Sequence, residues 1–202
     1  MSEKFADLPN YSYLLDYYHE YSNPKMKIVQ QCKKGELIKL KQGLYLSWNA
    51  LDAGIPMGLI ANCLYGPSYV SFAYALRMYS MIPEDVPNPT SATFSKRRRK
   101  RYDTSICSFF YRDVPVAAYP LEIVYVQSGK WRYLAASKEK ALCDELSTIP
   151  GIRSKKTLHS LLFEDLRIDE NIFESLDFPV LKRLAPLYRS TTLDAFLDLI
   201  GG

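Results

Sequence analysis

The chain has 202 residues, of which 48% are hydrophobic and 24% charged, and its formal net charge at pH 7 is only +4. Such a length and composition are typical of a folded chain with one generous domain or with a small domain joined to a larger one. Neither a run of roughly 18 apolar residues, as a membrane helix requires, nor the apolar stretch of a signal peptide is present, so we expect a cytoplasmic protein without membrane contact.

The first predicted element is an amphipathic helix over residues 11–21. Tyr11, Leu14, Leu15 and Tyr18 recur at helical spacing and form one apolar face. We expect this face to cover the apolar side of the helix that follows.

A second short helix is predicted to begin at Asn23 and to end at Gly35. Asn23 is a good cap, Pro24 suits the first turn, and Gly35 tolerates the left-handed conformation that ends a helix. The spacing places an apolar set inside (Ile28, Val29, Cys32) and a polar set outside (Lys27, Gln30, Lys34), the latter flanked by Gln31 and Lys33.

A tight hairpin follows, with strands over residues 37–40 and 44–46 joined by residues 41–43. Six lysines lie between Lys25 and Lys41 against the single Glu36. A polar helix face followed by a basic hairpin is typical of the second half of a winged helix-turn-helix, and it suits a DNA groove and its phosphates. The alternative is a solvated helix on a small structural subdomain. The DNA-contacting candidates are Lys25, Lys27, Gln30, Gln31, Lys33, Lys34, Lys39, Lys41 and Gln42.

The remaining chain predicts a mixed α/β domain with a small sheet and a C-terminal helical bundle. Residues 47–55 are interpreted as a linker, and helices begin near Pro56 and after Ser71, which is expected to cap the second of them. Strands are predicted over residues 90–94, 105–112, 121–127 and 131–135, the last two as a hairpin. Further helices are predicted over residues 137–147, 155–163, 169–176, 178–188 and 192–200. The expected organisation is an α+β protein with a winged helix-turn-helix over residues 1–50 and the α/β domain over residues 51–202.

A second basic segment consists of six consecutive cations between two predicted strands: Lys96, Arg97, Arg98, Arg99, Lys100 and Arg101. Such a run cannot be buried, so we expect an exposed loop. It is either a solvated hairpin tip or a phosphate-binding patch for DNA or RNA that is insensitive to sequence and sensitive to salt.

Signals for catalysis and metal binding are weak. His19 and His159 are isolated on predicted helices, and the chain has no P-loop, nucleophile elbow or zinc-protease motif. The best acidic cluster is Glu139, Asp144 and Glu145, and Glu122 in the predicted strand 121–127 is alone, without the lysine two residues on that a nuclease site would need. Cys32, Cys63, Cys107 and Cys143 lie far apart in apolar settings, which predicts buried free thiols in a reducing compartment. We therefore expect no enzyme activity, cofactor or metal; a nucleic-acid-cleaving enzyme is the remote alternative.

Four segments together resemble one family. They are residues 33–46 (KKGELIKLKQGLYL), 66–87 (GPSYVSFAYALRMYSMIPEDVP), the strand-rich 90–135 and 134–146 (LAASKEKALCDEL). In this order and spacing the chain resembles the AbiE-type abortive-infection antitoxins, which are winged-helix regulators of type IV toxin–antitoxin systems with an appended antitoxin domain. The most specific marks are Tyr-Val-Ser with the following Ala-Leu, and Ser-Lys-Glu-Lys-Ala-Leu.

The resemblance implies a repressor that binds inverted repeats in its own promoter, as a monomer or weak dimer. It also implies an adjacent nucleotidyltransferase-like toxin, which the second domain counters without forming a stable complex. By position, the family's DNA contacts correspond to Lys27, Gln30, Gln31 and Lys34 on the helix and to Lys39, Lys41 and Gln42 on the wing. A non-catalytic protein- or RNA-binding module with a vestigial winged helix is the alternative.

Overall fold

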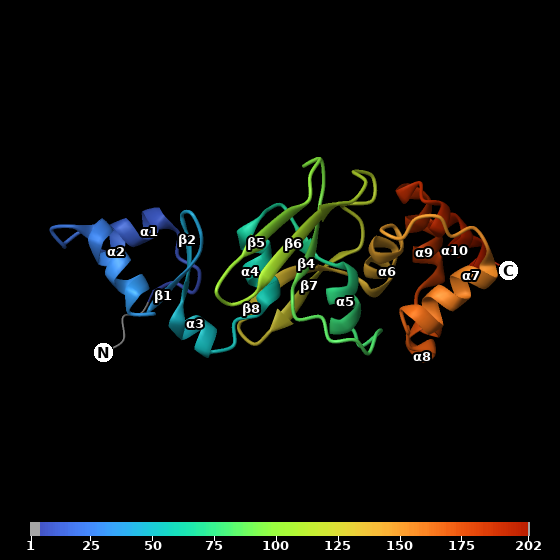
Figure 1. The fold of residues 1–202 in the computed structure, drawn as a ribbon, viewed down its shortest axis with the longest axis horizontal. Coiled ribbons are helices and arrows are strands. Elements are labelled where there is room, and N and C mark those ends of the chain that lie inside the picture. The colour runs from blue at the N-terminus through green and yellow to red at the C-terminus, as the bar shows by residue number, and fades with distance from the viewer. Residues whose placement is uncertain (1–4, 202) are drawn as a thin grey trace.

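The structure of the protein, a computed structural model, describes residues 5–201. The molecule is elongated, with the amino-terminal elements at one end, a mixed sheet in the middle and the last helices at the other end (Figure 1). Within the described residues the chain forms ten α-helices and two sheets, of two and six strands, which confirms a mixed α+β class. No helix in this range is both long and apolar enough to cross a bilayer.

The amino-terminal elements are helix α1 (Tyr11–Tyr17), helix α2 (Pro24–Lys33), and strands β1 (Leu37–Lys41) and β2 (Leu44–Ser47). The two strands pair antiparallel, as predicted, and α1 ends earlier than the periodicity indicated. Leu14, Tyr18, Ile28, Leu37 and Tyr45 form the buried cluster that holds helices and hairpin together.

Residues 48–52, within the predicted linker 47–55, form a helix. The Ser47 hydroxyl accepts a hydrogen bond from the amide of Ala50 at 3.1 Å and caps helix α3 (Trp48–Asp52). Ala50 then packs in one apolar cluster with Leu46 of the hairpin and with Ile60 of helix α4 (Met57–Leu64). Because a single-residue cap and a buried alanine carry little periodicity, the sequence pattern did not predict this helix.

The larger sheet has the strand order β5-β6-β4-β3-β8-β7. Its strands are β3 (Tyr69–Val70), β4 (Thr90–Thr93), β5 (Lys100–Asp103), β6 (Ser108–Asp113), β7 (Ile123–Ser128) and β8 (Trp131–Ala136). The predicted β7–β8 hairpin is confirmed, with Ser128 opposite Trp131. Strands β3–β8 and β4–β6 pair parallel, and the other neighbours pair antiparallel.

Side chains alternate between the two faces of this sheet. Val70 and Ala135 point into the cluster under α4, whereas Tyr69 and Ala136 point into the main core on the other face. Helices α5 (Phe72–Met78) and α6 (Lys138–Leu146) belong to that second core. The sheet therefore connects the amino-terminal unit on one side with the carboxy-terminal helices on the other.

The tail forms helices α7 (Lys155–Ser160), α8 (Glu170–Glu174), α9 (Phe178–Leu184) and α10 (Thr191–Gly201). A π-helical turn, η1 (Leu161–Asp165), extends α7, and a 3-10 turn, η2 (Ala185–Tyr188), extends α9. The predicted apolar stripe Leu181, Leu184, Ala185 and Tyr188 is buried in the main core, together with Leu193 and Phe196. These helices pack on the domain, as their stripes required.

Gly58 marks the closest approach of α4 to the sheet. A Cβ atom at this position would overlap the ring of Tyr133 on β8, which is itself buried. Although alanine favours helices by about 1 kcal/mol over glycine, overpacking costs about 1–3 kcal/mol. We expect Gly58→Ala to lower the free energy of unfolding in urea, while Gly201→Ala, which meets no atom within 4 Å, leaves it unchanged or higher. Equal or greater stability of Gly58→Ala would contradict this packing.

Candidate nucleic-acid interface

Helix α2 is built by the local signals that its sequence carries. The Asn23 side chain accepts a hydrogen bond from the Met26 amide at 3.1 Å, and Gly35 ends the helix at a φ of +79°. Ile28 is buried against α1 and the hairpin. The opposite side of the helix is therefore turned to solvent at the end of the molecule farthest from the carboxy-terminal helices (Figure 1).

The outer face of α2 consists of six exposed side chains: Lys25, Met26, Val29, Gln30, Lys33 and Lys34. Within residues 5–201, none of its four polar members is in an ion pair or a side-chain hydrogen bond. Met26 and Val29 keep 53% and 47% of their surface exposed. The face thus offers three ammonium groups, one amide and two apolar side chains to a partner.

Three predictions for this helix need correction. Gln31 is buried at 3% exposure and points into the fold, so it cannot contact DNA. Lys27 is half-buried, with its ammonium 4.5 Å from the centre of the Tyr21 ring. Val29, predicted inside, is outside, because the inward arc is centred on Ile28 and Gln31.

The hairpin provides fewer free groups than predicted. Lys39 and Gln42 are exposed, but the Lys41 ammonium donates a hydrogen bond to the carbonyl of Leu64 at the end of α4. The Gly43 carbonyl accepts the Tyr11 amide at 2.9 Å, which ties the turn to α1. The turn of the hairpin therefore packs back on the protein, and Lys41 is not free to reach a phosphate.

The second basic run is only partly the loop that was predicted, because Lys100 and Arg101 belong to strand β5. Alternate side chains point to different neighbours. The Lys96 and Lys100 ammoniums lie 5.4 and 4.9 Å from the centres of the Tyr65 and Tyr102 rings. Arg98 interacts with the Tyr65 hydroxyl, which raises the pKa of its guanidinium.

Arg97 and Arg99 instead line a hollow of about 380 Å³ together with Arg98, Arg112, Asp113, Ser147 and Thr148. Both oxygens of Asp113 are occupied, one by the Thr93 hydroxyl and one by the Arg97 amide, each at 2.7 Å. Arg101 differs from the rest, since its guanidinium is paired with Asp103 at 2.6 Å.

The acidic cluster Glu139, Asp144 and Glu145 does not converge. Glu139 accepts the Asp177 amide, Glu145 accepts the Ala73 amide, and Asp144 points into the core. Among residues 5–201, no group of three or more histidines, cysteines or acidic residues is placed to hold a metal. Of the four free cysteines only Cys143 is buried; Cys63 is exposed because it lies on the outward side of α4, so the prediction of buried thiols is wrong there.

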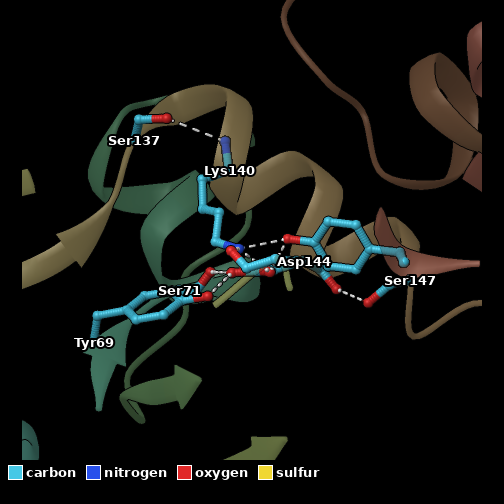
Figure 2. Close-up of polar contacts among 8 residues, drawn as sticks. Tyr69, Ser71, Ser137, Lys140, Asp144 and Ser147 are labelled. Atoms are coloured by element: carbon cyan, nitrogen blue, oxygen red, sulfur yellow. Dashed lines mark hydrogen bonds and ion pairs between the residues drawn. The ribbon is translucent and has the colours of Figure 1, made fainter. Parts of the chain in front are cut away.

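A buried polar network that the sequence pattern did not predict surrounds Asp144 (Figure 2). Its carboxylate accepts hydrogen bonds from the hydroxyls of Tyr69 at 3.0 Å, Ser71 at 2.6 Å and Tyr188. Lys140, one helical turn before it, lies 3.6 Å away and donates to the Ala118 carbonyl at 2.6 Å and to Tyr188. Burial raises the pKa of Asp144 and lowers that of Lys140, and their mutual attraction opposes both shifts.

This network contains residues from the two most specific marks of the family resemblance. Tyr69 and Ser71 come from Tyr-Val-Ser, and Lys140 comes from Ser-Lys-Glu-Lys-Ala-Leu. Because Ser71 donates to Asp144, it makes no capping bond to α5, contrary to the prediction. The side chains of Lys140 and Asp144 are 0% exposed, so the arrangement cannot reach a substrate and serves to join the sheet to the helical core.

No protein-family model and no curated protein matches the chain.

Proposed function

We propose that the protein is a DNA-binding transcriptional autorepressor and the antitoxin of an abortive-infection toxin–antitoxin system, acting in the cytoplasm without a cofactor. The observation that carries the DNA-binding part is the exposed outer face of α2, where Lys25, Lys33 and Lys34 lie beside Gln30 without an ion-pair partner among residues 5–201. A winged helix has a short helix followed by a hairpin, and it places the helix in the major groove with the hairpin beside it.

The partner in this proposal is the duplex of the protein's own promoter, bound at inverted repeats by a monomer or weak dimer. Counteracting an adjacent nucleotidyltransferase-like toxin rests on the family resemblance alone. In line with a repressor, each member of the acidic cluster Glu139, Asp144 and Glu145 is bonded within the fold.

The direct test is the affinity of the full chain for its upstream region and for an unrelated duplex of equal length. Specific DNA binding is typically at least about 10³-fold tighter than non-specific binding, so we expect a preference of that order. Fluorescence anisotropy at one stated salt concentration measures both dissociation constants. Equal affinity for the two duplexes would reject the repressor function.

A second candidate function is a protein- or RNA-binding module with a vestigial winged helix. The packed turn favours it, because Lys41 is bonded to Leu64 and the hairpin cannot extend freely along a groove. In that case RNA or an acidic protein partner co-purifies with the chain and promoter preference is absent.

A further inference from the structure

The two basic segments, separated by more than fifty residues in the sequence, meet in space. Lys41 of the hairpin lies 5.9 Å from the centre of the Tyr102 ring, and Lys100 lies 4.9 Å from the same ring. The centres of the Tyr102 and Tyr65 rings are 6.1 Å apart, and the Lys96 ammonium lies over the Tyr65 ring. The two tyrosines therefore join the amino-terminal unit to the second basic run.

Contacts within the protein hold the backbone of the run at Arg97 and the side chains of Lys96, Arg98 and Lys100. Lys96 donates to the Gly66 carbonyl at 3.4 Å, and the Arg97 amide donates to Asp113 at 2.7 Å. Lys96 and Lys100 lie over the ring faces of Tyr65 and Tyr102, and Arg98 interacts with the Tyr65 hydroxyl. Arg98 also lines the hollow with Arg97, Arg99 and Arg112. We call Lys96, Arg97, Arg98, Arg99 and Lys100 the cationic ridge.

From this geometry we propose that the cationic ridge is a second nucleic-acid site, which binds the sugar–phosphate backbone of duplex DNA without reading its sequence. Five neighbouring cations with no acidic ion-pair partner in the described chain offer their charge to phosphates. Base stacking is disfavoured because lysine ammoniums already lie over the faces of both tyrosine rings. Duplex DNA is the favoured ligand because the ridge is continuous with the hairpin of the proposed DNA-binding unit, and to that extent the inference rests on the proposed function.

Arg101 provides an internal control, since Asp103 already neutralises it. The two side chains are paired at 2.6 Å, and the Ser108 hydroxyl together with Arg101 holds the pKa of Asp103 below its ordinary value. Arg99, two residues earlier and also exposed, has no such partner in the described chain. The two arginines therefore differ in pairing and not in exposure.

The experiment measures the affinity of the full chain for a duplex of unrelated sequence as a function of salt. Each phosphate contact contributes about 0.9 to the slope of log affinity against log salt. We expect Arg99→Gln to lower the slope by about one contact and the triple variant Lys96/Arg98/Lys100→Gln by up to three, roughly 2.7. Arg101→Gln and the charge-matched control Lys155/Lys156/Lys182→Gln, which removes exposed cations of the tail, should leave it unchanged.

Equal slopes for the ridge variants and their controls would overturn the proposal. So would a loss confined to an RNA duplex measured in parallel, because that result assigns the ridge to RNA. The ratio of the affinity for the promoter duplex to the affinity for the unrelated duplex separates this inference from the proposed function. Ridge variants should keep the ratio that the unmodified chain shows. If the unmodified chain shows no promoter preference, the proposed repressor fails, while the slopes still decide on the ridge.

Discussion

Replacing Lys140 by methionine should destabilise the protein by about 3–5 kcal/mol, because the change leaves the buried carboxylate of Asp144 without its counter-charge. Both side chains are 0% exposed, so water cannot take the place of the ammonium. The Ala118 carbonyl and the Tyr188 hydroxyl also lose a donor. Chemical denaturation measures the loss, and Lys182→Met, an exposed change in α9, should stay within about 0.5 kcal/mol of the unmodified chain.

The double variant Lys140→Met/Asp144→Asn tests whether the charge itself is responsible. A neutral amide oxygen still accepts hydrogen bonds from the hydroxyls around it and carries no charge to be buried, so we expect it to recover a large part of the lost stability. If the double variant is as unstable as Lys140→Met, the loss comes from packing and not from the unpaired carboxylate.

The pH dependence of Lys140→Met follows from the same argument. Burial already raises the pKa of Asp144, and removing the lysine raises it further. A group whose folded-state pKa is raised contributes stability below its unfolded-state pKa, about 3.9 for aspartate, and loses that contribution as the pH rises through the folded-state pKa. The stability difference between variant and unmodified chain should therefore be largest at neutral pH and should shrink toward pH 4.

The elements predicted best are those whose signals are local. Asn23, Pro24 and Gly35 define the ends of α2, and the same kind of signal at Ser137 defines the start of α6. Strand β3 has only two residues, Tyr69 and Val70, and exists because β4 and β8 lie on either side of it. Strand β5 begins with Lys100 and Arg101, whose charges hide a strand that pairing with β6 creates. These two strands depend on their neighbours and leave no periodic pattern of their own.

The sequence predicted the candidate surfaces only in part, because some of their contacts join segments that are distant in the chain. Helical spacing placed Gln30, Lys33 and Lys34 outside correctly, but it could not show that Gln31 turns inward. Nor could it show that Lys41 bonds to Leu64, because that contact joins segments far apart in the chain. The Lys140–Asp144 pair did leave a signal in the sequence. The two residues carry opposite charges one helical turn apart, and the apolar Ala141 and Leu142 lie between them. Opposite charges at this spacing are compatible with a buried ion pair as well as with a surface one.

Replacing Met26, Val29 and Gln30 together by alanine should abolish most of the sequence preference of the proposed repressor. These three are the uncharged side chains of the outer face of α2, and each can read a base: an amide pairs with adenine, and apolar groups contact the thymine methyl. We assign the three lysines of this face to phosphates. The first arginine of the chain is Arg77, so of the two cationic side chains that read guanine the amino-terminal unit contains lysine and no arginine. We expect A·T pairs at the promoter positions that Met26, Val29 and Gln30 contact.

The expected size follows from about 1–3 kcal/mol of discrimination for each good base contact, so three contacts amount to at least about 3 kcal/mol, or more than 100-fold in the ratio of promoter to unrelated affinity. The matched variant Lys25/Lys33/Lys34→Ala removes only cations from the same face. It should weaken binding to both duplexes alike and flatten the salt dependence, because phosphate contacts carry no sequence information. Alanine suits a helix interior, so circular dichroism should show both variants folded. A preference that survives in Met26/Val29/Gln30→Ala would place base recognition on another element.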